Sequence, residues 1–148
     1  MSKKLLIFLM AIGVALIFVA TGLQAGTKVA DTFKMESKEY KSHKKGIVEF
    51  THKKHNIDYK ISCGECHHDK DNKPLDVKMG DDVQRCVECH DKIKKRKEDK
   101  KNIMVHQNAI HGNCISCHKD VNKKAGDPKG RKGPAPASCT KCHPKTKK

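Results

Sequence analysis

Residues 50–68 read FTHKKHNIDYKISCGECHH and place two cysteines and four histidines within nineteen positions. The stretch ends in a Cys-x-x-Cys-His unit, and three further copies of that unit follow it in the chain. We call residues 50–68 the ligand-rich stretch and expect the fold to be organised around it. Its side chains with ligand chemistry are Cys63, Cys66, His52, His55, His67 and His68.

The Cys-x-x-Cys-His unit occurs at irregular intervals, which argues against a solenoid of fixed-length repeats. It is the attachment signature of c-type haem. Two thiols form thioether bonds to one porphyrin, and the following histidine is placed beneath the iron as the proximal ligand. The expected attachment cysteines are Cys63 and Cys66, Cys86 and Cys89, Cys114 and Cys117, and Cys139 and Cys142; the expected proximal ligands are His67, His90, His118 and His143.

Three other chemistries use paired cysteines. Structural zinc uses Cys-x-x-Cys knuckles but does not require a histidine directly after each pair. Thioredoxin-type dithiols are expected near a βαβ pattern, which is absent from the sequence. Structural disulfides suit an exported protein but do not explain the histidines. Haem attachment is therefore favoured, with zinc as the main alternative.

Composition gives the chain a formal net charge of +15 and little apolar material. After residue 25, Ile, Leu, Val and Phe make up about 14 % of the chain, and the only leucine is Leu75. A charged chain in which these four residue types make up less than roughly 20 % is expected to stay disordered unless something else forms its interior. Flat apolar porphyrins would supply that interior, so haem attachment and folding are expected to be coupled.

The first twenty-five residues have the pattern of a secretory signal. Lys3 and Lys4 precede an apolar run over residues 5–20, and Ala25 ends a segment typical of a cleavage site. We expect residues 1–25 to be removed and the rest of the chain to reach the periplasm. An uncleaved membrane anchor is the alternative, although the apolar run is shorter than the about 20 residues of a membrane span.

The remaining chain indicates few regular elements. Residues 26–46 are polar and lysine-rich and are expected to form a flexible or loosely docked lead-in, followed by a short strand over residues 47–50. Residues 85–101 and 103–111 are helix candidates, and Gly112 is expected to end the second. Two segments rich in turn-forming residues are expected to be loops: 69–74 and 127–136.

Six histidines remain after the proximal set, against three methionines after residue 25. This abundance favours bis-histidine ligation, which gives lower reduction potentials than a methionine–histidine pair. His68 is expected to reach a neighbouring haem, because the adjacent His67 is committed to its own. His52 and His55 are three residues apart, so they are expected to serve two different haems.

Two histidines are candidates for one of the four sixth ligands. His106 and His111 both precede the third motif, and His111 is favoured because it lies just ahead of Cys114.

At this point the sequence resembles a known family. Phe50, His52 and His55, followed by Cys63-Gly-Glu-Cys66-His67-His68, resemble the first half of a tetrahaem class III cytochrome c, the cytochrome c3 family. Its members are periplasmic electron carriers of sulfate- and metal-reducing bacteria. The similarity covers roughly residues 47–146 and implies a tetrahaem domain over residues 47–148. All four cysteine gaps here are two residues, whereas several members have four at haems 2 and 4.

The resemblance also implies the axial ligand of each haem. Carried over position by position, it gives His52 for haem 1 at Cys63 and Cys66, His68 for haem 2 at Cys86 and Cys89, His55 for haem 3 at Cys114 and Cys117, and His111 for haem 4 at Cys139 and Cys142.

The family implies a small, mostly irregular and α-helical fold wrapped around four haems, with a short N-terminal two-stranded β piece. With histidine on both sides of every iron, no substrate site is open, so an electron carrier is expected rather than an enzyme. The alternative is a terminal reductase of metals or oxyanions, which would require a haem without its sixth ligand.

Basic residues are dense around the fourth motif and would steer an acidic redox partner by salt-sensitive attraction. The alternative is that they only keep the surface soluble. The resemblance suggests a periplasmic hydrogenase or formate dehydrogenase as donor and a membrane cytochrome complex as acceptor, in anaerobic or sulfate respiration. The export signal disfavours nucleic acid, and membrane contact is expected only if the signal is uncleaved. The basic residues are Lys119, Lys123, Lys124, Lys129, Arg131, Lys132, Lys141, Lys145, Lys147 and Lys148.

Overall fold

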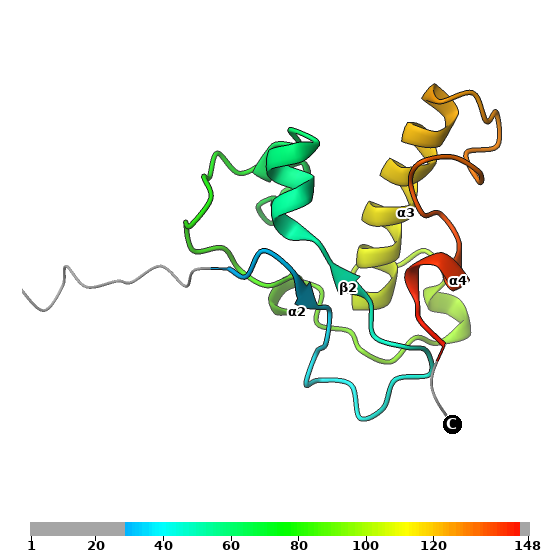
Figure 1. Ribbon diagram of the computed structural model, residues 1–148. Helices are drawn as coiled ribbons and strands as arrows, with labels where there is room; N and C mark the ends of the chain where they lie inside the picture. Colours follow the sequence, from blue (N-terminus) through cyan, green and yellow to red (C-terminus); the bar gives the residue numbers. More distant parts are fainter. Residues whose placement is uncertain (1–28, 146–148) are drawn as a thin grey trace, which may run out of the picture. The chain divides into compact units, whose positions relative to one another are not determined.

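The computed structural model describes residues 29–145, which form short elements joined by loops (Figure 1). Residues 29–79 and 83–145 belong to one compact unit, to which the following description applies. The expected signal segment, residues 1–25, lies outside the described residues. The elements are β1 Phe33–Lys34, β2 Glu49–Phe50, the π-helical turn η1 Lys54–Asp58, the 3-10 turn η2 Cys63–Glu65, α2 Cys86–Cys89, the 3-10 turn η3 Lys97–Asp99, α3 His106–Lys124 and α4 Cys139–Cys142.

The two strands form an antiparallel ribbon whose second strand leads into the ligand-rich stretch at Phe50. Phe33 pairs with Phe50, and their rings meet edge to face at a centroid distance of 5.5 Å. The amide of Met35 extends the pairing by donating to the carbonyl of Val48 at 2.8 Å. This confirms the expected two-stranded β piece, whose second strand is β2.

The polar segment before residue 47 is more closely attached than its composition indicates. It contributes β1, and Ser37 is buried with 6 % of its surface exposed. Tyr40 packs against His106 of α3 at a ring-centroid distance of 5.7 Å, and the carbonyl of Gly46 accepts a hydrogen bond from His143. These contacts join the segment to the start of α3 and to the fourth motif.

The prediction of a helix over residues 85–101 is wrong beyond the first turn of that segment. The helix α2 ends at Cys89, because the backbone of His90 leaves helical geometry with φ −92° and ψ 66°. Lys92 then forms a parallel bridge with Val105, and the following residues run through the short turn η3. The three- and four-residue spacing that predicted a helix belongs to the single turn of the Cys-x-x-Cys-His unit itself.

The helix expected over residues 103–111 is longer than predicted. The helix α3 begins at His106, passes through Gly112 and ends at Lys124, where Ala125 leaves helical geometry and Gly126 adopts φ +99°. Over its 19 residues it spans roughly 28 Å and contains the whole third motif. A mid-helix glycine costs about 1 kcal/mol relative to alanine, so Gly112 weakens α3 without ending it. The two segments expected to be loops are loops.

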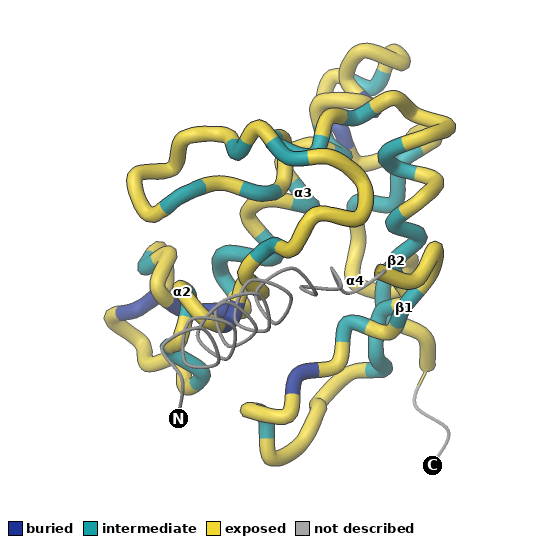
Figure 2. The backbone as a smooth tube through the Cα atoms, turned by 90° about the vertical axis from the view of Figure 1, so that its left-hand side faces the viewer, coloured by how far each residue is buried: buried dark blue, intermediate teal, exposed yellow. Residues whose placement is uncertain are grey.

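Few side chains of the described residues are buried, as the tube in Figure 2 shows by its small dark segments. The buried apolar side chains among them are Val87 and Val105. Burying two valines contributes only a few kcal/mol, at about 1.5–3 kcal/mol each. The protein's own apolar side chains therefore supply little of the stabilisation that ordering this chain requires. None of the helices described in residues 29–145 has the length and hydropathy to cross a membrane.

Candidate functional site

Each Cys-x-x-Cys-His unit of the chain forms one helical turn. The turn lies in η2, α2, α3 and α4 respectively. In three of the units the histidine amide closes the turn onto the carbonyl of the first cysteine: His67 onto Cys63 at 2.9 Å, His90 onto Cys86 at 2.8 Å, and His143 onto Cys139 at 2.8 Å. Because one turn brings residues three and four apart onto the same side, it places the two thiols and the histidine on one face.

Each of these four histidines lies near a second histidine that belongs to none of the four Cys-x-x-Cys-His units. The rings are 5.8–6.4 Å apart between centroids in all four cases, and the partners come from the ligand-rich stretch or from α3. The pairs are His52 with His67 at 6.4 Å, His68 with His90 at 5.8 Å, His55 with His118 at 6.1 Å, and His111 with His143 at 6.1 Å.

This separation fits one metal ion held between two imidazoles. With a metal–nitrogen distance of about 2 Å on each side, the two ring centroids lie roughly 6 Å apart. Aromatic rings in edge-to-face contact span a similar range of centroid distances. What distinguishes these pairs is that every motif histidine has another histidine at this separation. The residues present therefore fit a haem iron between the members of each pair.

Backbone carbonyls hold five of the eight paired rings. The proximal rings of His90, His118 and His143 donate from Nδ1 to the carbonyls of Ile103 (2.7 Å), Pro136 (2.6 Å) and Gly46 (2.8 Å), and the distal rings of His55 and His68 donate to those of Thr51 (2.8 Å) and Asp69 (2.8 Å). A carbonyl can only accept, so Nδ1 carries the proton in each ring. The lone pair of the neutral imidazole is then on Nε2, the arrangement usual for a metal-ligating histidine.

For two of the other paired rings, the surroundings lower the pKa. Burial, followed by the neighbouring His52, lowers the pKa of His67, and burial, followed by His143, lowers the pKa of His111. A histidine must be neutral to bind a metal ion, so these lowered pKa values favour ligation. Nδ1 of His52 is buried and has no hydrogen-bond partner among the described residues.

Thiols from all four motifs lie near Cys114. Burial, followed by the nearby cysteines Cys66, Cys86, Cys142 and Cys117, raises the pKa of the half-buried Cys114 thiol to about 11. The thiol is therefore protonated at neutral pH. A neutral thioether carries no charge to desolvate, so this environment suits the attached form of the cysteine better than a thiolate.

The two histidines outside the four pairs both lie near Tyr40. His106 is buried, with 7 % of its surface exposed, and its Nδ1 is 3.1 Å from the Tyr40 hydroxyl. His43 lies 5.5 Å from the Tyr40 ring. Of the two candidates for the fourth haem, the structure thus brings His111 to His143 and His106 to Tyr40.

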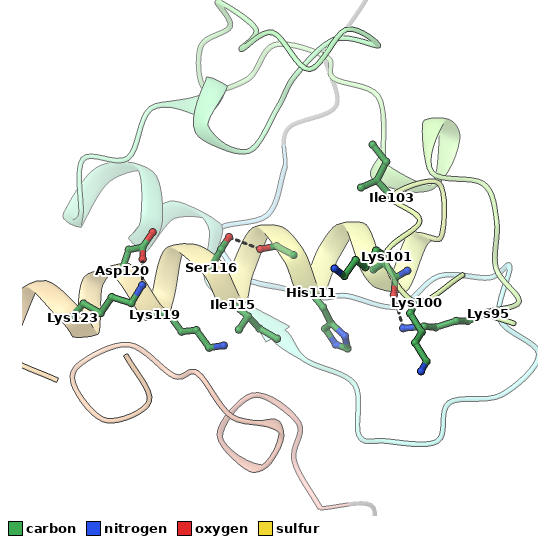
Figure 3. Close-up of a pocket in the computed structure, with 12 residues that line it drawn as sticks. Lys95, Lys100, Lys101, Ile103, His111, Ile115, Ser116, Lys119, Asp120 and Lys123 are labelled. Carbon is green, nitrogen blue, oxygen red and sulfur yellow. Dashed lines mark hydrogen bonds and ion pairs between the residues drawn. The ribbon is translucent and has the colours of Figure 1, made fainter. Parts of the chain in front are cut away.

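A cavity of about 600 Å³ runs along α3 beside the His111–His143 pair. Figure 3 shows His111 and Ile115 on the same side of this helix, facing the cavity. Asp120 also lines it, but the lining is dominated by cationic side chains and suits an anionic group such as a carboxylate. The lysines are Lys95, Lys100, Lys101, Lys119 and Lys123.

Sequence reasoning found the paired histidines but not the groups that orient them. Three acceptors for the proximal rings are backbone carbonyls in loops, and such groups have no side-chain signature. Asn108 and Asn122 fix two of these loops through hydrogen bonds from α3, but in a polar helix they look like solvent-facing residues. No sequence signal singles them out.

Four attachment motifs, each with a second histidine facing its own, define a multihaem cytochrome c. The model of the Class III cytochrome C family matches residues 28–146. The chain therefore belongs to this family of multihaem electron carriers, whose cofactor is covalently bound c-type haem. A comparison with curated proteins gave no match.

Proposed function

We propose that the protein is a periplasmic, low-potential electron carrier with four bis-histidine c-type haems. The observation that carries the proposal is the set of four histidine pairs, each joining a motif histidine to a histidine outside the motifs with ring centroids 5.8–6.4 Å apart. Bound haem supplies one-electron chemistry at iron. The chain's part is to hold each iron with two neutral imidazoles, which lowers the potential relative to a methionine ligand.

The proposed axial ligands are the motif histidine and its partner in each pair. The set is His67 and His52 for haem 1, His90 and His68 for haem 2, His118 and His55 for haem 3, and His143 and His111 for haem 4. Attachment would use Cys63 and Cys66, Cys86 and Cys89, Cys114 and Cys117, and Cys139 and Cys142. With these ligands in place no iron is left for substrate, so the protein would carry electrons rather than catalyse a reaction of its own.

The ligand-rich stretch would fix the relative positions of three haems. It would provide both axial ligands of haem 1, His67 and His52. It would also provide His68 as a ligand of haem 2 and His55 as a ligand of haem 3. The helix α3 would connect haems 3 and 4, because His118 and His111 lie two turns apart on one helix. Electrons would pass between haems held at fixed separations by these two segments.

The decisive experiment is the intact mass and visible spectrum of protein exported by a host that attaches haem. We expect a mass with four haems, cleavage after Ala25, and the spectrum of low-spin bis-histidine haem. Fewer than four haems would contradict the tetrahaem assignment, and zinc without haem absorbance would contradict the cofactor. A high-spin iron in the native protein would instead favour a terminal reductase.

The proposed partners are acidic redox proteins. Resemblance to the family points to a periplasmic hydrogenase or formate dehydrogenase as donor and a membrane cytochrome complex as acceptor, in anaerobic respiration. The high positive charge supports attraction that weakens as salt rises. One loop carries the exposed side chains of Lys129, Arg131 and Lys132. The backbone amides of these residues donate hydrogen bonds to the Asp127 carboxylate, which fixes the backbone positions from which the three side chains extend.

Reversing these charges tests the docking proposal. We expect the triple variant Lys129→Glu, Arg131→Glu and Lys132→Glu to slow electron exchange with an acidic donor and to flatten its dependence on ionic strength. A matched control reverses three lysines far away in sequence: Lys38→Glu, Lys41→Glu and Lys44→Glu. Equal effects of the two triple variants would mean that net charge alone steers the partner, without a docking loop.

A further inference from the structure

One buried asparagine holds the loop that follows α3. Asn122 is fully buried, with 0 % of its surface exposed. Its Nδ2 donates to the carbonyls of Gly130 at 3.2 Å and Ala135 at 2.9 Å, and its Oδ1 accepts from the amide of Ala135 at 2.9 Å. The side chain thus satisfies both backbone groups of Ala135 and fixes the loop against the helix.

The loop backbone is shaped to approach this side chain. Gly133 has φ +148°, and a Cβ added there would lie 2.5 Å from Oδ1 of Asn122. Gly130 has φ +61°, and a Cβ added there would lie 2.5 Å from the carbonyl oxygen of Lys119. Both positions favour glycine by conformation and by space. The position of the loop therefore depends on Asn122 and on the two glycines that let it close.

The residue after Ala135 supplies the acceptor for a proximal histidine. The carbonyl of Pro136 lies 2.6 Å from Nδ1 of His118 and accepts its hydrogen bond. Since Ala135 and Pro136 are adjacent, any shift of the loop at Ala135 moves this carbonyl. A direct chain of contacts thus runs from Asn122 through Ala135 to the ring of His118.

We propose that Asn122 is a positioning residue that lowers the reduction potential of the haem ligated by His118. The proposal rests on the proposed function, which makes His118 an axial ligand. A hydrogen bond from Nδ1 to a carbonyl raises the basicity of the ligating nitrogen. A more basic ligand favours the ferric state, so holding Pro136 at 2.6 Å from the ring lowers the potential.

A second asparagine of the same helix offers an internal comparison. Nδ2 of Asn108 donates to the carbonyls of Asp99 at 2.7 Å and Asn102 at 2.9 Å. The next carbonyl along that loop, on Ile103, accepts from Nδ1 of His90 at 2.7 Å. Asn108 therefore bears the same relation to His90 that Asn122 bears to His118, but for a different haem.

The test is a redox titration of the holoprotein in which each haem is followed separately by NMR or EPR. Asn122→Ala is expected to raise the potential of the His118 haem alone, shifting its reduction equilibrium about threefold to tenfold; tenfold corresponds to about 59 mV for one electron. Asn108→Ala is expected to shift the His90 haem instead. Val121→Ala, on the exposed face of α3, is the matched control and should shift neither.

A second variant disturbs the same contact without removing Asn122. Gly133→Ala keeps Asn122 but pushes the loop away from it, so it should shift the same haem in the same direction. If both variants leave the His118 haem unchanged, or shift all haems equally, the role of Asn122 is refuted while four low-spin haems would still support the proposed function. Fewer than four haems in the unaltered protein would refute the proposed function itself, and with it this inference.

Discussion

The rings of His55 and His118 lie in nearly parallel planes, inclined by 24°, with centroids 6.1 Å apart. His55 comes from the ligand-rich stretch and His118 from the middle of α3. Both rings donate from Nδ1 to a backbone carbonyl, so both are fixed in the tautomer that leaves Nε2 free. The other three pairs are inclined by 63–87°.

Replacing His55 with methionine should change a single haem. We expect His55→Met to raise the potential of the His118 haem, because a thioether ligand stabilises ferrous iron relative to imidazole. Redox titration with EPR should show one altered low-spin signal and three unchanged ones. His43→Met is the matched control, because His43 faces Tyr40 rather than a motif histidine. Equal changes in the two variants would contradict the pairing.

The choice between His111 and His106 gives a second prediction. His111→Ala should remove the sixth ligand of the His143 haem and produce one high-spin iron, which absorption and EPR spectra report. His106→Ala should keep all haems low-spin, because the ring of His106 in the unaltered protein lies within hydrogen-bond distance of the Tyr40 hydroxyl rather than beside His143. A high-spin signal in the His106 variant alone would reverse the assignment.

The amount of structure predictable from sequence differs between the elements. The β piece and both loops follow from local composition and from the family resemblance, and they are present. The prediction of a helix over residues 85–101 is wrong because the Cys-x-x-Cys-His unit forms one turn wherever it occurs and imitates helical periodicity. The helix predicted over residues 103–111 is too short because it was expected to end at Gly112, through which α3 continues. The turn stops at His90 in α2 but continues through Cys114–His118 in α3. Tertiary contacts decide between these outcomes, and single-sequence patterns do not contain them.

The candidate site divides in the same way. Motif residues such as His118 can be read from sequence because their chemistry requires fixed spacing, and the partner of each follows only from the resemblance. The ligand roles of all eight histidines stay predictions, although the structure brings the rings together in pairs. The carbonyl of Pro136 and the side chain of Asn122 were not predictable, because their role arises from how a loop closes on a helix.

Asp99 gives a pH-dependent prediction. Its buried carboxylate accepts from Lys92 at 2.6 Å and from the amide of Arg96 at 3.0 Å, and these contacts, led by Lys92, lower the pKa of Asp99. A lowered pKa means that Asp99 stabilises the fold above the usual carboxyl pKa of about 3.9. This contribution is lost as pH falls through the lower value of the folded state.

Asp99→Asn should therefore lower the midpoint of thermal unfolding at pH 5–7, a range that lies above the ordinary carboxyl pKa of about 3.9. The difference from the unaltered protein should shrink as the solution is acidified below about pH 4. Asp120→Asn is the matched control, since the exposed pair of Asp120 and Lys123 at 3.0 Å contributes little. A difference for Asp99→Asn that stays constant down to the lowest pH would contradict the role given to its ionised form.

Gly46 connects the N-terminal segment to the fourth motif, and its substitution should affect stability and one haem together. Its carbonyl accepts from Nδ1 of His143 at 2.8 Å, and a Cβ at this position would collide with the carbonyl oxygen of Pro144. Because the obstacle is backbone, Gly46→Ala must displace one segment, at a cost of about 1–3 kcal/mol. The longer hydrogen bond should raise the potential of the His143 haem.

Gly112→Ala is the control: its Cβ meets no protein atom within 4 Å, so it should stabilise α3 by about 0.5–1 kcal/mol. Chemical unfolding followed by circular dichroism, with a redox titration of each variant, separates the two effects. Unchanged stability and potential in Gly46→Ala would show that the segment before residue 47 is not held against the fourth motif.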